Sequence, residues 1–204
     1  MYMLLAHGSS HANHAVQVKA LAEQVSTLLG KPVGTAFLSD KTLPQEATVL
    51  PLFLGYGKHL SQDVPKLIQG ANAKMLQPLV ESSDALSSLI VQRLIKDSKR
   101  IHVLAVVYQF TGFEKLVAAL YKQGKPCSMF AISALHGAPN ISSVLTNLKE
   151  QGIKKVVLQP VLLFDGHSLE LCKTKAEEVG IEVEIQPALT TLDGFAALVA
   201  NIFE

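Results

Sequence analysis

Short apolar runs alternate with longer amphipathic stretches along the whole chain. Each apolar run is bounded by Gly, Pro, Ser or charged residues, which is typical of buried strands that end in turns. We expect strands at residues 3–6, 33–38, 48–54, 74–77, 101–107, 128–133, 155–163 and 182–186.

The stretches between these runs carry apolar residues at helical spacing. In the first of them, Val18, Leu21, Val25 and Leu28 fall on one helical face, and Gly30 marks the end of the helix. The same pattern predicts helices at 82–95, 113–121, 141–151, 169–179 and 192–203. Strands that alternate with helices through short connections predict an α/β fold, in which helices cover a parallel sheet.

The two halves of the chain align with each other. The segment Pro51-Leu52-Phe53-Leu54 matches Pro160-Val161-Leu162-Leu163, which lies 109 residues later. At this offset Gly57 pairs with Gly166, Leu60 with Leu169, Lys66 with Lys175, Gln77-Pro78 with Gln186-Pro187, Asp84 with Asp193 and Leu89 with Leu198. The sequence therefore predicts a duplicated α/β unit.

One helix is missing from the first copy of this unit. Gly30-Lys31-Pro32 matches Gly124-Lys125-Pro126 at an offset of only 94 residues, and the second half has a helical pattern at 141–151 where the first has only 41–47. We expect two tandem repeats of a small parallel-sheet domain, flavodoxin- or Rossmann-like and related by pseudo-twofold symmetry, at residues 1–97 and 98–204. A cleft between the repeats, at the carboxyl ends of their strands, is the expected ligand site.

Composition narrows the class of protein. Hydrophobic residues make up 49% and charged residues 17%, so a sizeable core is available. The net charge of +1 without a basic run argues against a nucleic-acid surface, and no run is long enough for a membrane span. Cys127 and Cys172 lie far apart and are expected to be reduced, packed thiols. We expect a cytoplasmic protein, and either a monomer or a homodimer fits the sequence.

Polar side chains follow the first three predicted strands of the first half. His7 follows the first strand, Ser39-Asp40 the second, and Lys58-His59 the third. Carboxyl ends of parallel strands converge on one sheet edge, so these side chains are expected to meet there. Two imidazoles and a carboxylate suit Co²⁺, Ni²⁺, Zn²⁺ or Fe²⁺, and the same groups can move protons.

The motifs around these residues resemble those of the sirohydrochlorin chelatases. These small cobalt- and iron-inserting enzymes of cobalamin and siroheme synthesis are class II tetrapyrrole chelatases. The resemblance is carried by His7-Gly8-Ser9-Ser10, Ala36-Phe37-Leu38, Pro51-Leu52-Phe53-Leu54, Gly57-Lys58-His59 and Asp63-Val64-Pro65. It covers essentially the whole chain, and the bilobal fold of the family agrees with the repeat.

The resemblance implies insertion of a divalent metal, the substrate Co²⁺ or Fe²⁺, into sirohydrochlorin. His7 and His59 would bind the ion and accept the pyrrole protons, with Asp40 as a third metal ligand. The carboxylates of the tetrapyrrole would be met by residues around the turn, the third strand and the opposite wall, namely Gly8, Ser9, Ser10, Ser39, Lys58 and His167. A Walker-type Gly-rich loop is absent from the sequence, so we expect no nucleotide cofactor.

Three departures from the family pattern keep other functions open. Ser39 stands where the family usually has Glu, the first half lacks a helix, and Val107-Tyr108-Gln109 occupies the repeat position of His7. A non-catalytic relative that binds a tetrapyrrole or a metal is the first alternative. The second is a flavodoxin-like module that binds a phosphate compound at the His7 turn. The sequence leaves the physiological metal open.

Several further residues have two interpretations. His11 and His14, three residues apart on the first predicted helix, are expected to be solvated, with a metal-delivery pair as the alternative. Tyr56 and Tyr108 could stack on a planar ring, although packing against a loop is the commoner role.

Overall fold

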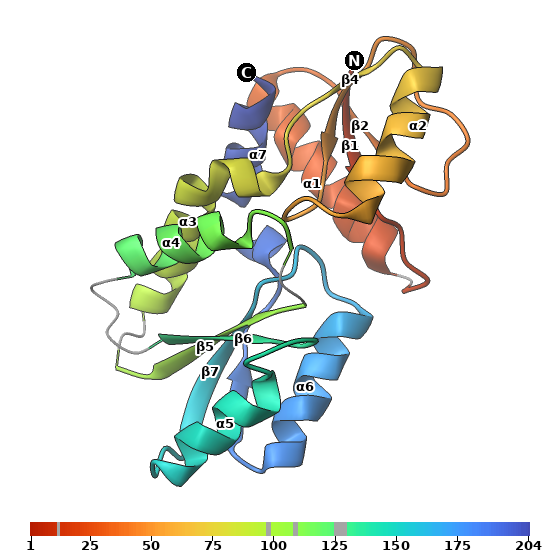
Figure 1. Ribbon diagram of the computed structural model, residues 1–204. Coiled ribbons are helices and arrows are strands. Elements are labelled where there is room, and N and C mark those ends of the chain that lie inside the picture. The colour runs from red at the N-terminus through yellow and green to blue at the C-terminus, as the bar shows by residue number, and fades with distance from the viewer. Residues whose placement is uncertain (12, 97–98, 108–109, 125–129) are drawn as a thin grey trace.

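Two parallel four-stranded sheets form the framework of the protein (Figure 1). The structure is a computed structural model that describes residues 1–11, 13–96, 99–107, 110–124 and 130–204. The first sheet has the order β2-β1-β3-β4 and the second the order β6-β5-β7-β8. The strands are β1 (Tyr2–Ala6), β2 (Val33–Phe37), β3 (Thr48–Pro51), β4 (Lys74–Met75), β5 (Ile101–Val106), β6 (Phe130–Ala134), β7 (Lys155–Pro160) and β8 (Glu182–Ile185). Equivalent strands hold equivalent places, so the predicted α/β fold with two similar halves is confirmed.

The helices follow the predicted pattern, with one addition. They are α1 (Asn13–Leu29), α2 (Val64–Gly70), α3 (Ser83–Ile95), α4 (Phe113–Gln123), α5 (Ile141–Glu150), α6 (His167–Val179) and α7 (Phe195–Phe203). A π-helical turn, η1 (His59–Asp63), precedes α2, and the 3₁₀ turns η2 (Leu79–Ser82) and η3 (Leu189–Thr191) precede α3 and α7. Helix α2 was not predicted. Pro65 lies in its first turn, where a missing N–H costs no hydrogen bond.

The strands β3 and β7 are shorter than the apolar runs that predicted them. They end at Pro51 and Pro160, three residues before the ends of those runs. Proline has no N–H to donate to the sheet, and the Phe53 N–H bonds to the Pro51 carbonyl in a tight turn. The chain therefore leaves the first sheet shortly before it reaches His59.

A loop replaces the missing helix of the first half. Helix α5 lies between β6 and β7, whereas β2 and β3 are joined without a helix at residues 38–47. Leu43 and Ala47, with exposed fractions of 6% and 0%, are packed against the apolar face that α2 also covers. The loop thus buries part of this face without a helix.

The last helix of each repeat packs against the other repeat. Helix α7, at the end of the second repeat, packs on α1, and the rings of Tyr2 and Phe203 lie 4.8 Å apart. Helix α3, at the end of the first repeat, packs on α4. Figure 1 shows α7 beside α1 at one end of the molecule and α3 beside α4 at its middle.

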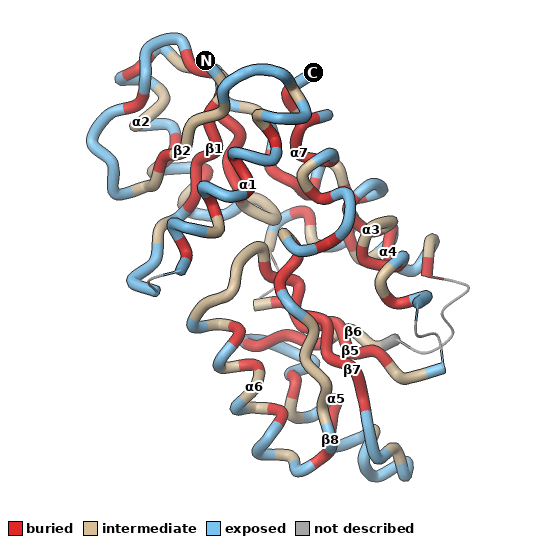
Figure 2. Tube along the Cα trace, turned by 180° about the vertical axis from the view of Figure 1, so that it is seen from behind, coloured by how far each residue is buried: buried red, intermediate tan, exposed pale blue. Residues whose placement is uncertain are grey.

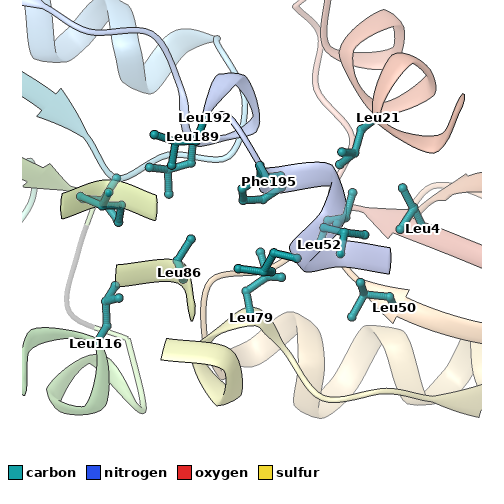
Figure 3. Close-up of a cluster of buried hydrophobic side chains, with 14 of the residues drawn as sticks. Leu4, Leu21, Leu50, Leu52, Leu79, Leu86, Leu116, Leu189, Leu192 and Phe195 are labelled. Carbon is teal, nitrogen blue, oxygen red and sulfur yellow. The ribbon is translucent and has the colours of Figure 1, made fainter. Parts of the chain in front are cut away.

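This exchange creates one hydrophobic core shared by both repeats. The core contains Leu4, Leu50, Leu86 and Phe195, which are labelled in Figure 3. It also contains Leu104 of the second sheet, so both sheets and the exchanged helices contribute to it. Figure 2 shows buried segments along the strands and on the inner sides of the helices, with exposed turns around them. The two halves are therefore held together by packing as well as by the chain that joins them.

Polar contacts add to this connection. The guanidinium of Arg93 on α3 donates to Gln159 Oε1 (3.2 Å), to the Pro187 carbonyl (3.0 Å) and to Thr191 Oγ1 (2.9 Å). Gln159 is fully buried on β7, so this is a satisfied polar contact inside the second half. The exchanged helix α3 is thereby tied to the second sheet.

Of the two cysteines, Cys172 lies within the described part of the chain. Cys172 is buried, and burial raises the pKa of its thiol to about 11, as expected of a packed, unreactive cysteine. Cys127 lies outside the described residues. Among the described helices, none combines the length and the apolar character that a membrane crossing needs.

Candidate functional site

The carboxyl end of β1 presents His7 at the surface of the molecule. Gly8, which follows it, has a φ of +90°, a conformation that favours glycine, and turns the chain toward α1. The Nδ1 atom of His7 lies 2.8 Å from the Gly8 carbonyl oxygen. A carbonyl oxygen can only accept, so Nδ1 carries the proton in this contact and Nε2 is left with its lone pair.

His59 is held in the same way by a carboxylate. It is the first residue of η1, which follows β3, and its Nδ1 lies 2.7 Å from Asp63 Oδ2. The hydrogen bond from His59 lowers the pKa of Asp63, so that group is a carboxylate at neutral pH and Nδ1 donates to it. In the neutral form of this ring, Nε2 of His59 therefore carries the lone pair.

The structure brings the two histidines together. Strands β1 and β3 are neighbours in the sheet, and the ring centroids of His7 and His59 are 4.5 Å apart with an edge-to-face angle of 74°. The ring of Phe53 lies 6.1 Å from that of His59 and is nearly parallel to it, which limits how far the imidazole can turn. Two imidazole rings, each with Nδ1 engaged in a hydrogen bond, thus lie side by side at the sheet edge.

Asp40 is not brought into this pair. Its Oδ2 accepts a hydrogen bond of 2.9 Å from the Phe37 N–H and so closes the turn after β2. Within the described part of the chain, no three His, Cys, Asp or Glu side chains are arranged to hold a metal ion. Ser39, in the turn that Asp40 closes, is the residue that lines a hollow together with His7 and His59.

An outer hollow of about 380 Å³ lies next to the histidine pair. His7, Ser39, His59 and Asp63 line it, together with Lys66. Lys58 is exposed and directly precedes His59. The carboxylate, the lysine and the serine give this hollow polar groups that an ion from solution can reach.

A second cavity, of about 310 Å³, lies between the two halves. Its walls come from the turns after β1, β3, β5 and β7, and from the start of α6. His7 lines this cavity as well as the outer hollow and so stands at the boundary between the two, whereas His59 lines the outer hollow. The other walls are mostly apolar, with Phe53, Phe110 and Phe164 among them. The volume lies at the lower end of the range for small-molecule sites, which is about 300–1,000 Å³.

Two of the remaining predicted substrate-binding residues line this cavity. Ser9 lines it, and its Oγ accepts a hydrogen bond from the His11 N–H. His167, at the start of α6, lines the opposite wall. Gly8 and Ser10 are in the turn after His7, and Ser10 is exposed and lines neither cavity.

Contacts between the halves fix the cavity walls. The Asp165 N–H donates to the side-chain oxygen of Gln17 on α1 (3.0 Å), and the Tyr56 N–H donates to the Thr111 carbonyl (3.1 Å). The Tyr56 hydroxyl donates to Gln77 Oε1, and the tyrosine packs against an apolar cluster of the first half and does not line this cavity. Tyr108 lies outside the described residues.

His14 was expected to be solvated, and that expectation is wrong. Its exposed fraction is 9%, and it lines the cavity between the halves. The ring lies 5.0 Å from that of Phe164 at an angle of 67°, and 6.1 Å from that of Phe37. Burial, with smaller contributions from His7 and His11, lowers the pKa of His14 below its usual 6.5. His11 itself is exposed.

The lowered pKa predicts a specific pH dependence of stability. Because the unfolded chain binds a proton at His14 more readily than the folded one, the free energy of unfolding should fall as the pH drops through 6.5 and below. His14→Leu should reduce this loss between about pH 8 and about pH 5. Urea denaturation of both proteins at the two pH values measures it, and an unchanged pH dependence would contradict the assignment.

The family of the chain follows from a comparison with family models. The model described as CbiX matches residues 1–97 and 109–203. The chain belongs to the CbiX family. A comparison with curated proteins gave no match.

Solved structures show the same fold for this CbiX family member. The structure described as "CbiX, the terminal Enzyme for Biosynthesis of Siroheme in Denitrifying Bacteria" has a TM-score of 0.77 and 17% identity, with 99% of this chain and 97% of that chain covered. SirB from Bacillus subtilis with Fe³⁺ has a TM-score of 0.74 and 16% identity, and the match covers 99% of this chain and 91% of that chain. The sirohydrochlorin chelatase SirB from Bacillus subtilis subspecies spizizenii, in complex with cobalt, has a TM-score of 0.71 and 16% identity, with the same coverage.

Sequence reasoning gave no role to Asp63 in this CbiX family member. The residue was noticed only as part of a motif, although it stands four positions after His59. That spacing brings two side chains together on a helical turn and was the signal that could have revealed the contact. A carboxylate that orients an imidazole and raises its basicity is a common feature of metal sites.

Proposed function

We propose that this protein inserts a divalent metal ion, Co²⁺ or Fe²⁺, into sirohydrochlorin without ATP, as a step of cobalamin or siroheme biosynthesis. One observation carries the proposal: two imidazoles with free Nε2 atoms lie side by side where a cavity between the halves meets a polar outer hollow. Membership of the CbiX family supports it.

A metal site with only two protein ligands suits an ion that is bound transiently and then transferred to the macrocycle. A structural zinc site uses four protein ligands and binds its metal permanently. His7 and His59 offer two nitrogens, and both Nδ1 atoms are occupied by hydrogen bonds that fix the ring orientation. An ion held there keeps open coordination positions, which the four pyrrole nitrogens of a macrocycle can take.

The walls of the cavity suit a planar ring with a charged rim. The apolar wall around Phe110 and Phe164 accommodates the macrocycle. The carboxylates would be received by Ser9 and His167 in the cavity wall, by the adjacent turn of Gly8 and Ser10, and by Ser39 and Lys58 near the outer hollow. A rigid cavity that holds the ring in a distorted form exposes its nitrogen lone pairs to the ion and so favours insertion.

The direct test is an absorption assay with the purified protein. Sirohydrochlorin is mixed with Co²⁺, and separately with Fe²⁺, and its absorption bands are followed over time with and without protein. We expect the protein to accelerate the spectral change of metal insertion with at least one of the ions. No acceleration with either ion would reject the proposal.

Non-catalytic binding is the second candidate, and Ser39 favours it. A hydroxyl stands beside the two histidines where the family usually has a Glu, so one negative charge is missing from the site. The same assay separates the two functions. A spectral shift of sirohydrochlorin on adding protein without metal, together with an unchanged insertion rate, would identify a binder.

The roles of the two nearby aspartates can be distinguished by substitution. Asp63→Asn removes the charge that orients His59 and should weaken Co²⁺ binding by about 10–100-fold. Asp40→Asn changes only a turn contact and should leave the affinity nearly unchanged. Equilibrium titration with Co²⁺ measures both, and the opposite order would restore Asp40 as the ligand.

A further inference from the structure

Metal insertion requires a base besides the two metal ligands. The reaction forms four metal–nitrogen bonds, breaks two pyrrole N–H bonds and releases two protons, with no change of oxidation state. While an ion is bound to Nε2 of His7 and His59, the Nδ1 atoms of both rings carry protons. Neither ring then has a lone pair for the first pyrrole proton.

His14 supplies a third imidazole inside the cavity. It lines the same cavity as His7, and Phe37 and Phe164 pack around its ring. Among the described residues, the ring of His14 has no hydrogen-bond partner. Burial keeps this imidazole neutral at physiological pH, so a ring nitrogen can accept a proton.

The other ionisable groups nearby are less suited to this task. Asp165 lines the cavity, but its Oδ1 accepts a hydrogen bond from the Ala188 N–H. His167 lines the opposite wall and is exposed, and His11 is exposed on the surface of the molecule. Of the imidazoles in the described cavity wall, His14 is the one shielded from water.

We propose that His14 is the base that takes the first pyrrole proton of the macrocycle while His7 and His59 still hold the metal ion. This inference rests on the proposed function. The electron pair of the broken N–H bond stays on the pyrrole nitrogen and forms a bond to the metal. Once the ion has left the two ligands, their Nε2 lone pairs can take the second proton, and water removes both.

His14→Ala tests this proposal in the full-length protein. The insertion rate should fall by about 10²-fold or more, in the range typical of general base catalysis, while Co²⁺ alone still binds as in the wild type. Added imidazole should restore part of the rate, because the substitution leaves space for a small base beside Phe164. His11→Ala, an exposed histidine just before α1, is the matched control and should keep the wild-type rate.

A second variant separates a proton acceptor from a packing residue. His14→Phe fills the same space without a base, so it should be as slow as His14→Ala and should not respond to imidazole. Wild-type rates in His14→Ala, or a Co²⁺ affinity that falls in parallel with the rate, would overturn the inference. A wild-type protein that does not insert metal would instead overturn the proposed function, so the two failures can be told apart.

Discussion

Replacing His7 or His59 by alanine should abolish metal insertion and leave the fold intact. Each substitution removes one of the two nitrogens that can hold the ion. A residue that only orients a metal ligand contributes about 10–100-fold, so the loss of a ligand should exceed that range and bring the rate to the uncatalysed background. The absorption assay with Co²⁺ and with Fe²⁺ measures the effect.

Two further measurements on these variants make the result specific. Equilibrium titration should show that either substitution also weakens the binding of Co²⁺ alone. The thermal unfolding temperature should stay close to that of the wild type, because His7 is exposed and the side chain of His59 is 41% exposed. Full activity in both variants would reject the assignment of the pair.

The meeting of His7 and His59 was predictable because it depends on sheet topology. Each residue follows an apolar strand, and parallel strands bring their carboxyl ends to one edge. The sequence does not state that β1 and β3 are neighbours, but the repeat and the family resemblance favour that order. The contact between His59 and Asp63 was within reach of the spacing alone, and only the failure to predict the helical turn concealed it.

The hydrogen-bond partner of Asp40 could not be predicted from the sequence. Its place after the second strand was correct, yet its carboxylate bonds to the Phe37 N–H and not to an ion. Short polar side chains compete for nearby backbone groups in turns, and the spacing of residues does not decide that competition. The burial of His14 could not be predicted for a different reason, because its neighbour Phe164 is far away in the sequence.

The exchange of α3 and α7 between the two repeats could not be predicted from the sequence either. The apolar spacing of a helix indicates that one face is buried, but it does not identify the sheet that covers that face. Both helices have such a face, and each could have packed on its own repeat. The structure places α7 on α1 and α3 on α4, which joins the repeats through their interior.

Phe195→Ala should therefore destabilise the whole molecule, by about 3–5 kcal/mol. Phe195 is the first residue of α7, is fully buried, and lies in the core shared by the two sheets (Figure 3). Truncation removes its buried apolar surface and leaves a cavity that the surrounding leucines fill only in part. Leu28→Ala, with 56% of the residue exposed on α1, is the control and should change the free energy of unfolding by about 0.5 kcal/mol or less.

The shape of the unfolding curve tests the shared core itself. Urea denaturation of the wild type and of Phe195→Ala should each give one cooperative transition, with the variant shifted to lower urea, because a core built from both repeats cannot lose one side and keep the other. Two separate transitions, with only the second one moved by the substitution, would mean that each repeat folds on its own helices. In that case the cavity between the halves would not be fixed by the exchanged helices, and its walls would have to be held by the Gln17–Asp165 and Tyr56–Thr111 contacts alone.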